Sequence, residues 1–231
     1  MQSKQIEQAF KTWAPIVQEF ALKPIMDTIL HKTIIDPKAN GINVFPASEL
    51  IFNAFKLCAY KDLKVVWVGL DPYPTAGDAT GICMGISRQT AKIPPTLKVL
   101  ALELLKEYPN ATLDYTMHSL ATQGFLMLNM ALTVIEHQSR SHLTHWRPFT
   151  EFLIKKLSIT NTGIIYVLLG KEAQILKSFI NSDSNYIITA PHPAAEVYSG
   201  GNAGFYGCNL FLRINEIIKS QYNTQINFGQ L

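Results

Sequence analysis

The stretch Lys64-Val65-Val66-Trp67-Val68-Gly69-Leu70-Asp71-Pro72-Tyr73-Pro74 decides the fold. A run of apolar, partly β-branched residues that ends in Gly and then Asp-Pro predicts a buried strand that stops abruptly at a loop. Open α/β sheets bind their ligands at the C-terminal ends of strands, which makes Asp71 a candidate functional carboxylate. Asp-Pro after a strand is also ordinary turn chemistry, so this stretch alone leaves both interpretations open.

Three further segments have the same form, an apolar run followed by polar or loop residues: Gly124–Leu128 before Asn129, Gly163–Leu169 before Gly170-Lys171, and Asn185–Ala190 before Pro191-His192-Pro193. Continuous apolar runs are typical of parallel strands that are buried on both faces. If the four strands lie parallel, the residues that follow them emerge at one edge of the sheet. A carboxylate, an amide and an imidazole at one edge indicate a catalytic site.

Between these strands the spacing of apolar residues is helical. Pro94-Pro95 precedes Leu97, Leu100 and Leu104, and Pro is favoured where a helix begins. Met1 to Phe20 also has helical spacing, and we expect that helix to be interrupted or kinked at Pro15. Strands that alternate with helices predict an α/β fold with a parallel sheet covered by helices on both faces.

Composition limits the class of protein. The 231 residues fit one domain, 1–231, and 48% hydrophobic content excludes a disordered chain. No apolar stretch is long enough to cross a bilayer, and the polar N-terminus is not a signal peptide. We therefore expect no membrane partner. The few, dispersed cysteines predict a reducing and hence intracellular compartment, the cytoplasm or, in a eukaryotic or viral setting, the nucleus.

Cysteines and charge are less specific. Cys58, Cys83 and Cys208 are too few and too dispersed for a disulfide framework or a Cys-x-x-Cys metal site. We predict no metal and no cofactor. A net charge of +3 permits binding to a polyanion but does not demand it.

Six motifs in the same order resemble those of family 1 uracil-DNA glycosylases. Gly69–Pro74 resembles the family's GQDPYH motif and Leu126–Val134 its LLLN-x-x-LTV segment; the others are Ile93–Leu97 (PPSL loop), Trp146–Thr150 (W-x-x-FT), His192-Pro193 (HPSPLS loop) and Gly204–Cys208 (GFFGC). The similarity extends from about Ala14 to the C-terminus. The cysteine count separates the chain from the uracil glycosylases that carry an iron–sulfur cluster, which need four cysteine ligands.

The resemblance implies a single-domain three-layer α/β/α fold with a central four-stranded parallel sheet. It implies a monofunctional enzyme of base-excision repair that flips uracil out of DNA and hydrolyses its glycosidic bond with an activated water. Asp71 would stabilise the positive charge that develops on the sugar and orient the water. His192 would donate a hydrogen bond to the 2-carbonyl of the departing base.

Four further residues correspond to the family's uracil pocket. The Asn129 amide would pair with the 4-carbonyl and the ring N–H of uracil, and cytosine reverses both groups. Tyr73 would exclude the methyl group of thymine. Leu70 stands where the family has Gln, whose backbone N–H Leu retains, and Met84 replaces the stacking Phe.

Three loops resemble those with which the family holds the DNA backbone: Pro94, Pro95 and Thr96; Gly170 and Lys171; and His192–Gly201, with Ala194, Glu196, Val197 and Tyr198. Family members insert a Leu, four residues after the catalytic His, into the gap left by the flipped nucleotide. That position is Glu196, whose charge makes it a poor wedge. We expect Tyr198, in preference to Val197, to be the wedge on a flexible loop.

Two alternatives to the repair enzyme stay open. Asp-Pro-Tyr-Pro and His-Pro-Ala-Ala also resemble divergent poxvirus glycosylases, some of which act as replication-processivity subunits, so a DNA-binding accessory with weak activity is one alternative. A glycosylase with shifted base preference is the other, because of Leu70 and Met84. The expected partner is uracil-containing DNA, single- or double-stranded, bound by a monomer. A protein inhibitor or a replication partner is also compatible with the resemblance.

Overall fold

The computed structural model describes residues 1–229, so the last two residues of the predicted domain lie outside the described part of the chain. Its centre is a four-stranded parallel sheet in the order β3-β2-β5-β6. The strands are β2 (Val65–Gly69), β3 (Phe125–Asn129), β5 (Ile165–Leu169) and β6 (Tyr186–Ala190). These are the four apolar runs of the sequence, and the predicted fold class is confirmed.

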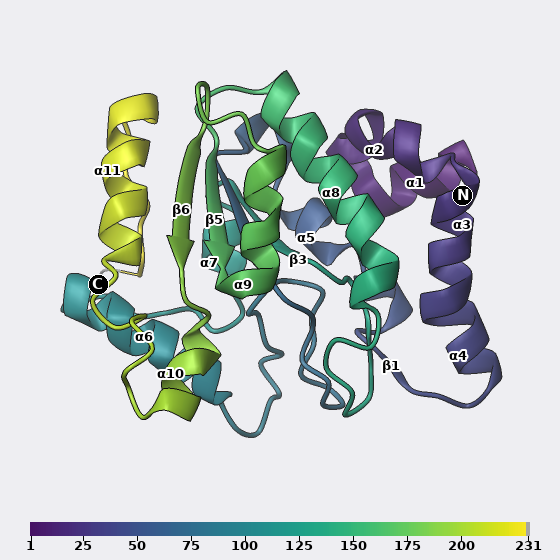
Figure 1. Ribbon diagram of the computed structural model, residues 1–231, viewed down its shortest axis with the longest axis horizontal. Helices are drawn as coiled ribbons and strands as arrows, with labels where there is room; N and C mark the ends of the chain where they lie inside the picture. Colours follow the sequence, from purple (N-terminus) through teal and green to yellow (C-terminus); the bar gives the residue numbers. More distant parts are fainter. Residues whose placement is uncertain (230–231) are drawn as a thin grey trace.

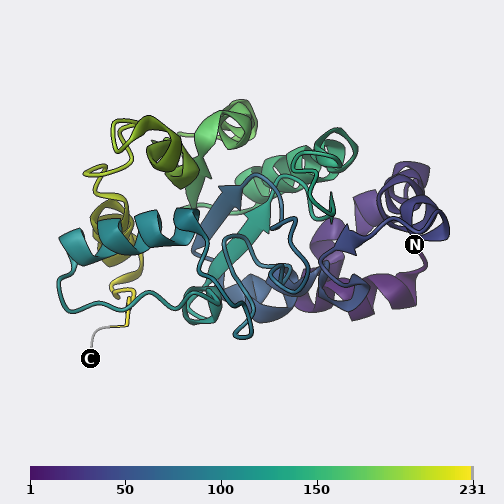
Figure 2. The same cartoon turned by 90° about the horizontal axis from the view of Figure 1, so that it is seen from below.

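Helices cover both faces of the sheet because successive side chains of a strand point to opposite sides. Val66 and Val68 of β2 pack into one core cluster, and Val65 and Trp67 pack into the other. The view in Figure 2 shows the sheet between its helical layers. The first face is covered by α1 (Ser3–Phe10), α2 (Ala14–Ala21), α3 (Pro24–Leu30), α5 (Asn53–Leu57) and α8 (Leu143–Thr160), and the second by α6 (Pro95–Glu107), α7 (His118–Ala121) and α11 (Leu210–Tyr222).

The remaining elements connect these layers. Two short strands, β1 (Val44–Phe45) and β4 (Val134–Ile135), pair antiparallel. The short helices are η1 (Lys11–Trp13), η2 (His31–Ile35), α4 (Asp36–Ala39), η3 (Ser48–Leu50), η4 (Tyr60–Asp62), α9 (Gly170–Gln174), η5 (Ile175–Phe179) and α10 (Pro193–Ser199). In Figure 1 the strands point toward the side of the molecule on which α10 lies.

Parallel pairing places the ends of the strands at one edge. Gly69 is the partner of Asn129 across β2 and β3, and Leu169 is the partner of Ala190 across β5 and β6. The residues that follow these strands therefore begin at the same edge of the sheet, as the sequence predicts. This edge carries the candidate site.

Two local predictions differ from the structure. The N-terminal helix breaks at Lys11, whose φ of 52° ends α1, whereas Pro15 lies in the first turn of α2, where a missing N–H costs nothing. The segment predicted as the loop His192–Gly201 is largely the helix α10. It starts at Pro193 and ends at Ser199, and the following Gly200 adopts the left-handed conformation that glycine allows after a helix end.

Among residues 1–229, no helix is both long and apolar enough to cross a membrane.

Candidate active site

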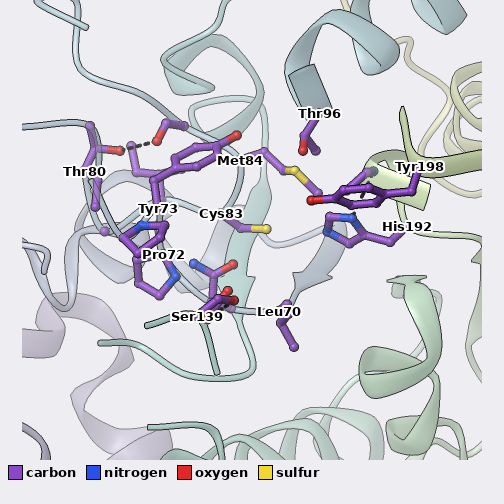
Figure 3. Close-up of a pocket in the computed structure, with 18 residues that line it drawn as sticks. Leu70, Pro72, Tyr73, Thr80, Cys83, Met84, Thr96, Ser139, His192 and Tyr198 are labelled. Atoms are coloured by element: carbon purple, nitrogen blue, oxygen red, sulfur yellow. Dashed lines mark hydrogen bonds between the residues drawn. The ribbon is translucent and has the colours of Figure 1, made fainter. Parts of the chain in front are cut away.

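A pocket of about 350 Å³ lies at the C-terminal edge of the sheet, and Asp71, Asn129 and His192 all line it. The three residues come from the ends of β2, β3 and β6, which explains why positions far apart in sequence meet there. Figure 3 shows the stick view of its lining residues. Of the other residues predicted from the sequence, the pocket is also lined by Leu70, Tyr73, Met84, Thr96, Ala194 and Tyr198.

Asp71 is held through one of its carboxylate oxygens. The Ser139 hydroxyl donates to Asp71 Oδ2 at 2.9 Å, and the backbone N–H of Arg140 donates a short hydrogen bond to the same oxygen. Burial raises the pKa of Asp71 above its ordinary value, while these two hydrogen bonds and the Arg140 charge counteract the rise. Ser139 and Arg140 were missed from the sequence, where no motif ties them to a residue almost seventy positions earlier.

His192 is oriented by the helix that follows it. It is the N-cap of α10, and its Nδ1 accepts a hydrogen bond of 3.2 Å from the backbone N–H of Ala194. Burial lowers the pKa of His192. A neutral imidazole that accepts at Nδ1 carries its proton on Nε2, so His192 can donate one hydrogen bond without being charged.

Gly170 makes room for this imidazole. Its φ is +83°, and a side chain added at this position would place its Cβ 2.9 Å from the Cβ of His192. Gly170 was predicted as a DNA contact from its loop. The structure gives it a second reason to be glycine, because any other residue would be strained and would push His192 out of place.

Asn129 is the last residue of β3 and is only 6% exposed. Its side-chain amide has no hydrogen-bond partner within residues 1–229, although buried polar groups are normally paired. The pocket around it is partly apolar: Met84, in the left-handed region with φ 62°, is buried, and the buried Tyr73 hydroxyl is also unpaired among the described residues. An unpaired amide in such a pocket is available to a flat polar ligand.

The residues predicted to contact DNA surround this pocket to different extents. Pro95 is the first residue of α6 and is followed by Thr96, and Pro94 is the N-cap of the helix. Lys171 is exposed in the first turn of α9 but does not line the pocket. Tyr198, in the last turn of α10, is 89% exposed, and the neighbouring Val197 is 45% exposed.

Glu196 requires a correction. The sequence places it among the DNA-contacting positions, but its side chain is only 2% exposed and faces the protein. Its carboxylate accepts hydrogen bonds from the backbone N–H groups of Ala203 and Tyr206, both at 3.0 Å, and of Phe205. Burial raises its pKa, but these donors outweigh that effect and hold the pKa below the ordinary range. Glu196 therefore ties α10 to the next turn.

Within residues 1–229, no group of three or more His, Cys, Asp or Glu side chains is arranged to hold a metal ion.

Comparison with known proteins agrees with this geometry. The model of the uracil DNA glycosylase superfamily matches residues 55–219. The chain belongs to this superfamily. Among its relatives, the uracil-DNA glycosylase of Aliivibrio fischeri is 34% identical over 221 residues, which cover 94% of this chain and 96% of the relative. That of Escherichia coli is 31% identical over 224 residues, 94% of each chain.

Solved structures have the same fold. Mimivirus uracil-DNA glycosylase superposes with a TM-score of 0.88 at 24% identity, covering 99% of this chain and 90% of that one. A mimivirus variant in complex with UGI gives a TM-score of 0.87 at 25% identity, with coverage of 100% and 92%. Membership of the uracil-DNA glycosylase superfamily and the four-stranded fold are both confirmed.

Proposed function

We propose that this protein is a monofunctional uracil-DNA glycosylase that removes uracil from DNA in base-excision repair. The observation that carries the proposal is the convergence of Asp71, Asn129 and His192 on one pocket at the C-terminal edge of the sheet. A DNA-binding accessory without activity has no use for a carboxylate, an unpaired amide and a neutral imidazole in one place. The membership of the glycosylase superfamily supports the same reaction.

The hydrolysis needs charge stabilisation on both sides of the bond that breaks. As the bond between C1′ and N1 lengthens, positive charge on the sugar faces Asp71, and the electron pair leaves with the base. The oxygen of a water then bonds to C1′ and its proton passes to the Asp71 carboxylate. The Nε2–H of neutral His192 donates to the 2-carbonyl oxygen, where the negative charge of the uracil anion gathers.

Asn129 reads the base. Its oxygen accepts a hydrogen bond from the ring N–H of uracil, and its NH₂ group donates one to the 4-carbonyl. With cytosine, the Asn129 oxygen would face the acceptor N3 and the NH₂ group would face the 4-amino donor. The ring of Tyr73 occupies the space into which the methyl of thymine would project. Met84 packs against the pyrimidine face, and the backbone N–H of Leu70 faces the 2-carbonyl.

The residues around the pocket hold the DNA. In this proposal the Thr96 hydroxyl and the Lys171 ammonium contact phosphates, and Pro94, Pro95, Gly170 and Ala194 shape the backbone path; Thr96 lines the pocket and Lys171 is exposed. Tyr198 occupies the gap that the flipped nucleotide leaves.

We further propose that the chain is a monomeric, divergent member of its family and acts inside the cell, in the cytoplasm or nucleus. Its three free cysteines fit a reducing compartment. A protein inhibitor comparable to UGI is a candidate partner, since a mimivirus relative has been solved with one.

The test is release of free uracil from a single-stranded and a duplex oligonucleotide, with the matched thymine and cytosine oligonucleotides as controls. We expect uracil to be released from its oligonucleotide alone, leaving an abasic site and an uncut strand. DNA binding without base release would support the replication-accessory alternative. Release of thymine or cytosine at a comparable rate would support the alternative of shifted base preference.

A further inference from the structure

The loop of residues 136–141 lies against the Asp71 turn, although the two segments are far apart in sequence. Ser139 lines the pocket, and its hydroxyl and the backbone N–H of Arg140 both donate to Asp71 Oδ2. The backbone N–H of His137 donates to the Pro74 carbonyl at 2.9 Å. No hydrogen bond from residues 1–229 reaches the other carboxylate oxygen of Asp71, Oδ1.

The backbone of this loop is held in an unusual conformation. His137 and Arg140 both have positive φ values, 59° and 71°, which non-glycine residues seldom adopt. Such strain persists only where the surrounding structure enforces it, and it is frequent at functional sites. Here the positive φ of Arg140 occurs at the residue whose N–H points at Asp71.

Both flanks of the loop are fixed. At its start, Glu136 donates its backbone N–H to the carbonyl of Asn43. At its end, the Ser141 hydroxyl accepts a hydrogen bond of 2.8 Å from the backbone N–H of Ile135, and the Arg140 guanidinium forms an ion pair with Glu172 of α9. The loop therefore presents its two donors to Asp71 from a fixed position.

We propose that Ser139, together with the backbone N–H of Arg140, is a positioning residue of the reaction that holds Asp71 by one oxygen and leaves the other free for the attacking water. The inference rests on the proposed function. Two donors on Oδ2 restrict rotation of the carboxylate, and Oδ1, which receives no hydrogen bond from residues 1–229, is left to accept one from a water in the pocket that Asp71 lines. They also favour the ionised form, which accepts the hydrogen bonds, and so oppose the effect of burial.

Other ionisable groups near Asp71 do not replace this contribution. The Arg140 charge is shared with Glu172. His192, across the pocket, is kept neutral by burial, and the buried thiol of Cys83 has a raised pKa and is uncharged. Removing the Ser139 hydroxyl should therefore destabilise the ionised form of Asp71 and raise its pKa, because none of these groups replaces the lost hydrogen bond.

Ser139→Ala tests the proposal. Ser178→Ala is the control, because the exposed Ser178 hydroxyl donates to the Ile175 carbonyl within η5 and touches neither Asp71 nor the loop of residues 136–141. We expect Ser139→Ala to lower kcat by about tenfold or more, the scale of one hydrogen bond to a charged group, with KM for uracil-containing DNA unchanged. The acid limb of its kcat profile should move to higher pH. Ser139→Thr should restore both values, and Ser178→Ala should leave them as in the wild type.

A second measurement does not depend on activity. In a ¹³C NMR titration of the Asp71 carboxyl, Ser139→Ala should raise the pKa above that of the wild type, and Ser178→Ala should not. Unchanged titration and unchanged kcat in folded Ser139→Ala, or equal losses in both variants, would overturn the proposal. If the wild type released no uracil while the NMR shift appeared, the proposed function would fail and the positioning of Asp71 by Ser139 would stand.

Discussion

Asp71 and His192 follow strands that end at the same edge of the sheet, yet the protein holds them in different ways. Asp71 follows β2 and accepts hydrogen bonds from Ser139 and Arg140, which belong to a loop far along the chain. His192 follows β6 and accepts a hydrogen bond from the backbone N–H of Ala194, two residues later, in the helix that His192 caps. The first arrangement depends on tertiary structure and the second on local structure.

This difference corresponds to the charge of each group. In the proposed reaction Asp71 acts in its ionised form although burial raises its pKa, and donors from a distant loop oppose that rise. The proposed role of His192 is that of a neutral donor; burial lowers its pKa, and one local hydrogen bond selects its tautomer. The Asp71 side of the pocket should therefore tolerate substitution less well than the His192 side.

The largest effect is expected for Asp71→Asn. This change removes the charge that faces the developing cation but retains the shape of the side chain, so turnover should fall by at least about 10³-fold, at or beyond the upper end of what one preorganised group contributes. DNA binding should survive, because the charge acts on the transition state. Single-turnover kinetics and a binding titration with uracil-containing DNA measure the two quantities. Equal losses in both would indicate a structural role for Asp71.

A smaller effect is expected for His192→Ala, about 10²–10³-fold in kcat, the value typical of one oxyanion donor. The pH profile of the wild type sharpens the comparison. Because burial lowers the His192 pKa, lowering the pH through the ordinary histidine value of about 6.5 should not change kcat. The rate should fall at lower pH, as Asp71 becomes protonated through a pKa raised above its ordinary value. A step near pH 6.5 that His192→Ala abolishes would contradict the neutral imidazole.

The two sides of the pocket also differ in what could be predicted from sequence. The four strands were predictable because they are buried on both faces, and parallel pairing then placed Asp71, Asn129 and His192 at one edge. Ser139 could not be predicted, since its contact with Asp71 exists only after β4 and the next loop have folded back on the strand ends. Burial of Glu196 was hidden for the same reason, because its partners are backbone groups of the following turn.

Asn129→Asp should change base specificity more than rate. It tests whether Asn129, at the end of β3, recognises the base or contributes to cleavage of the glycosidic bond. A protonated aspartate presents an O–H where the amide presents NH₂, and an ionised one accepts from the amino group of cytosine. We expect the variant to release cytosine from DNA at a measurable rate while its activity on uracil declines. Well-folded Asn129→Asp that releases no cytosine would argue against the reading role. The Tyr73→Ala variant, which should admit thymine instead, is the matched control for a general loosening of the pocket.

The smallest effect is expected at the C-terminal end of α10. His192 caps the start of this helix, and Tyr198, the predicted wedge, lies in its last turn. Tyr198 is 89% exposed while Glu196 is buried and bound to the next turn, so the helix presents the aromatic ring outward on a fixed support. Stacking of one base on an aromatic ring contributes about 1–3 kcal/mol, and Tyr198→Ala should weaken base flipping by that amount. Tyr198→Phe should keep it, because the ring is retained, and Val197→Ala should resemble the wild type. Fluorescence of a base analogue beside uracil reports flipping directly. If Tyr198→Ala flips uracil as the wild type does, Tyr198 is a surface residue of α10 and the wedge lies elsewhere.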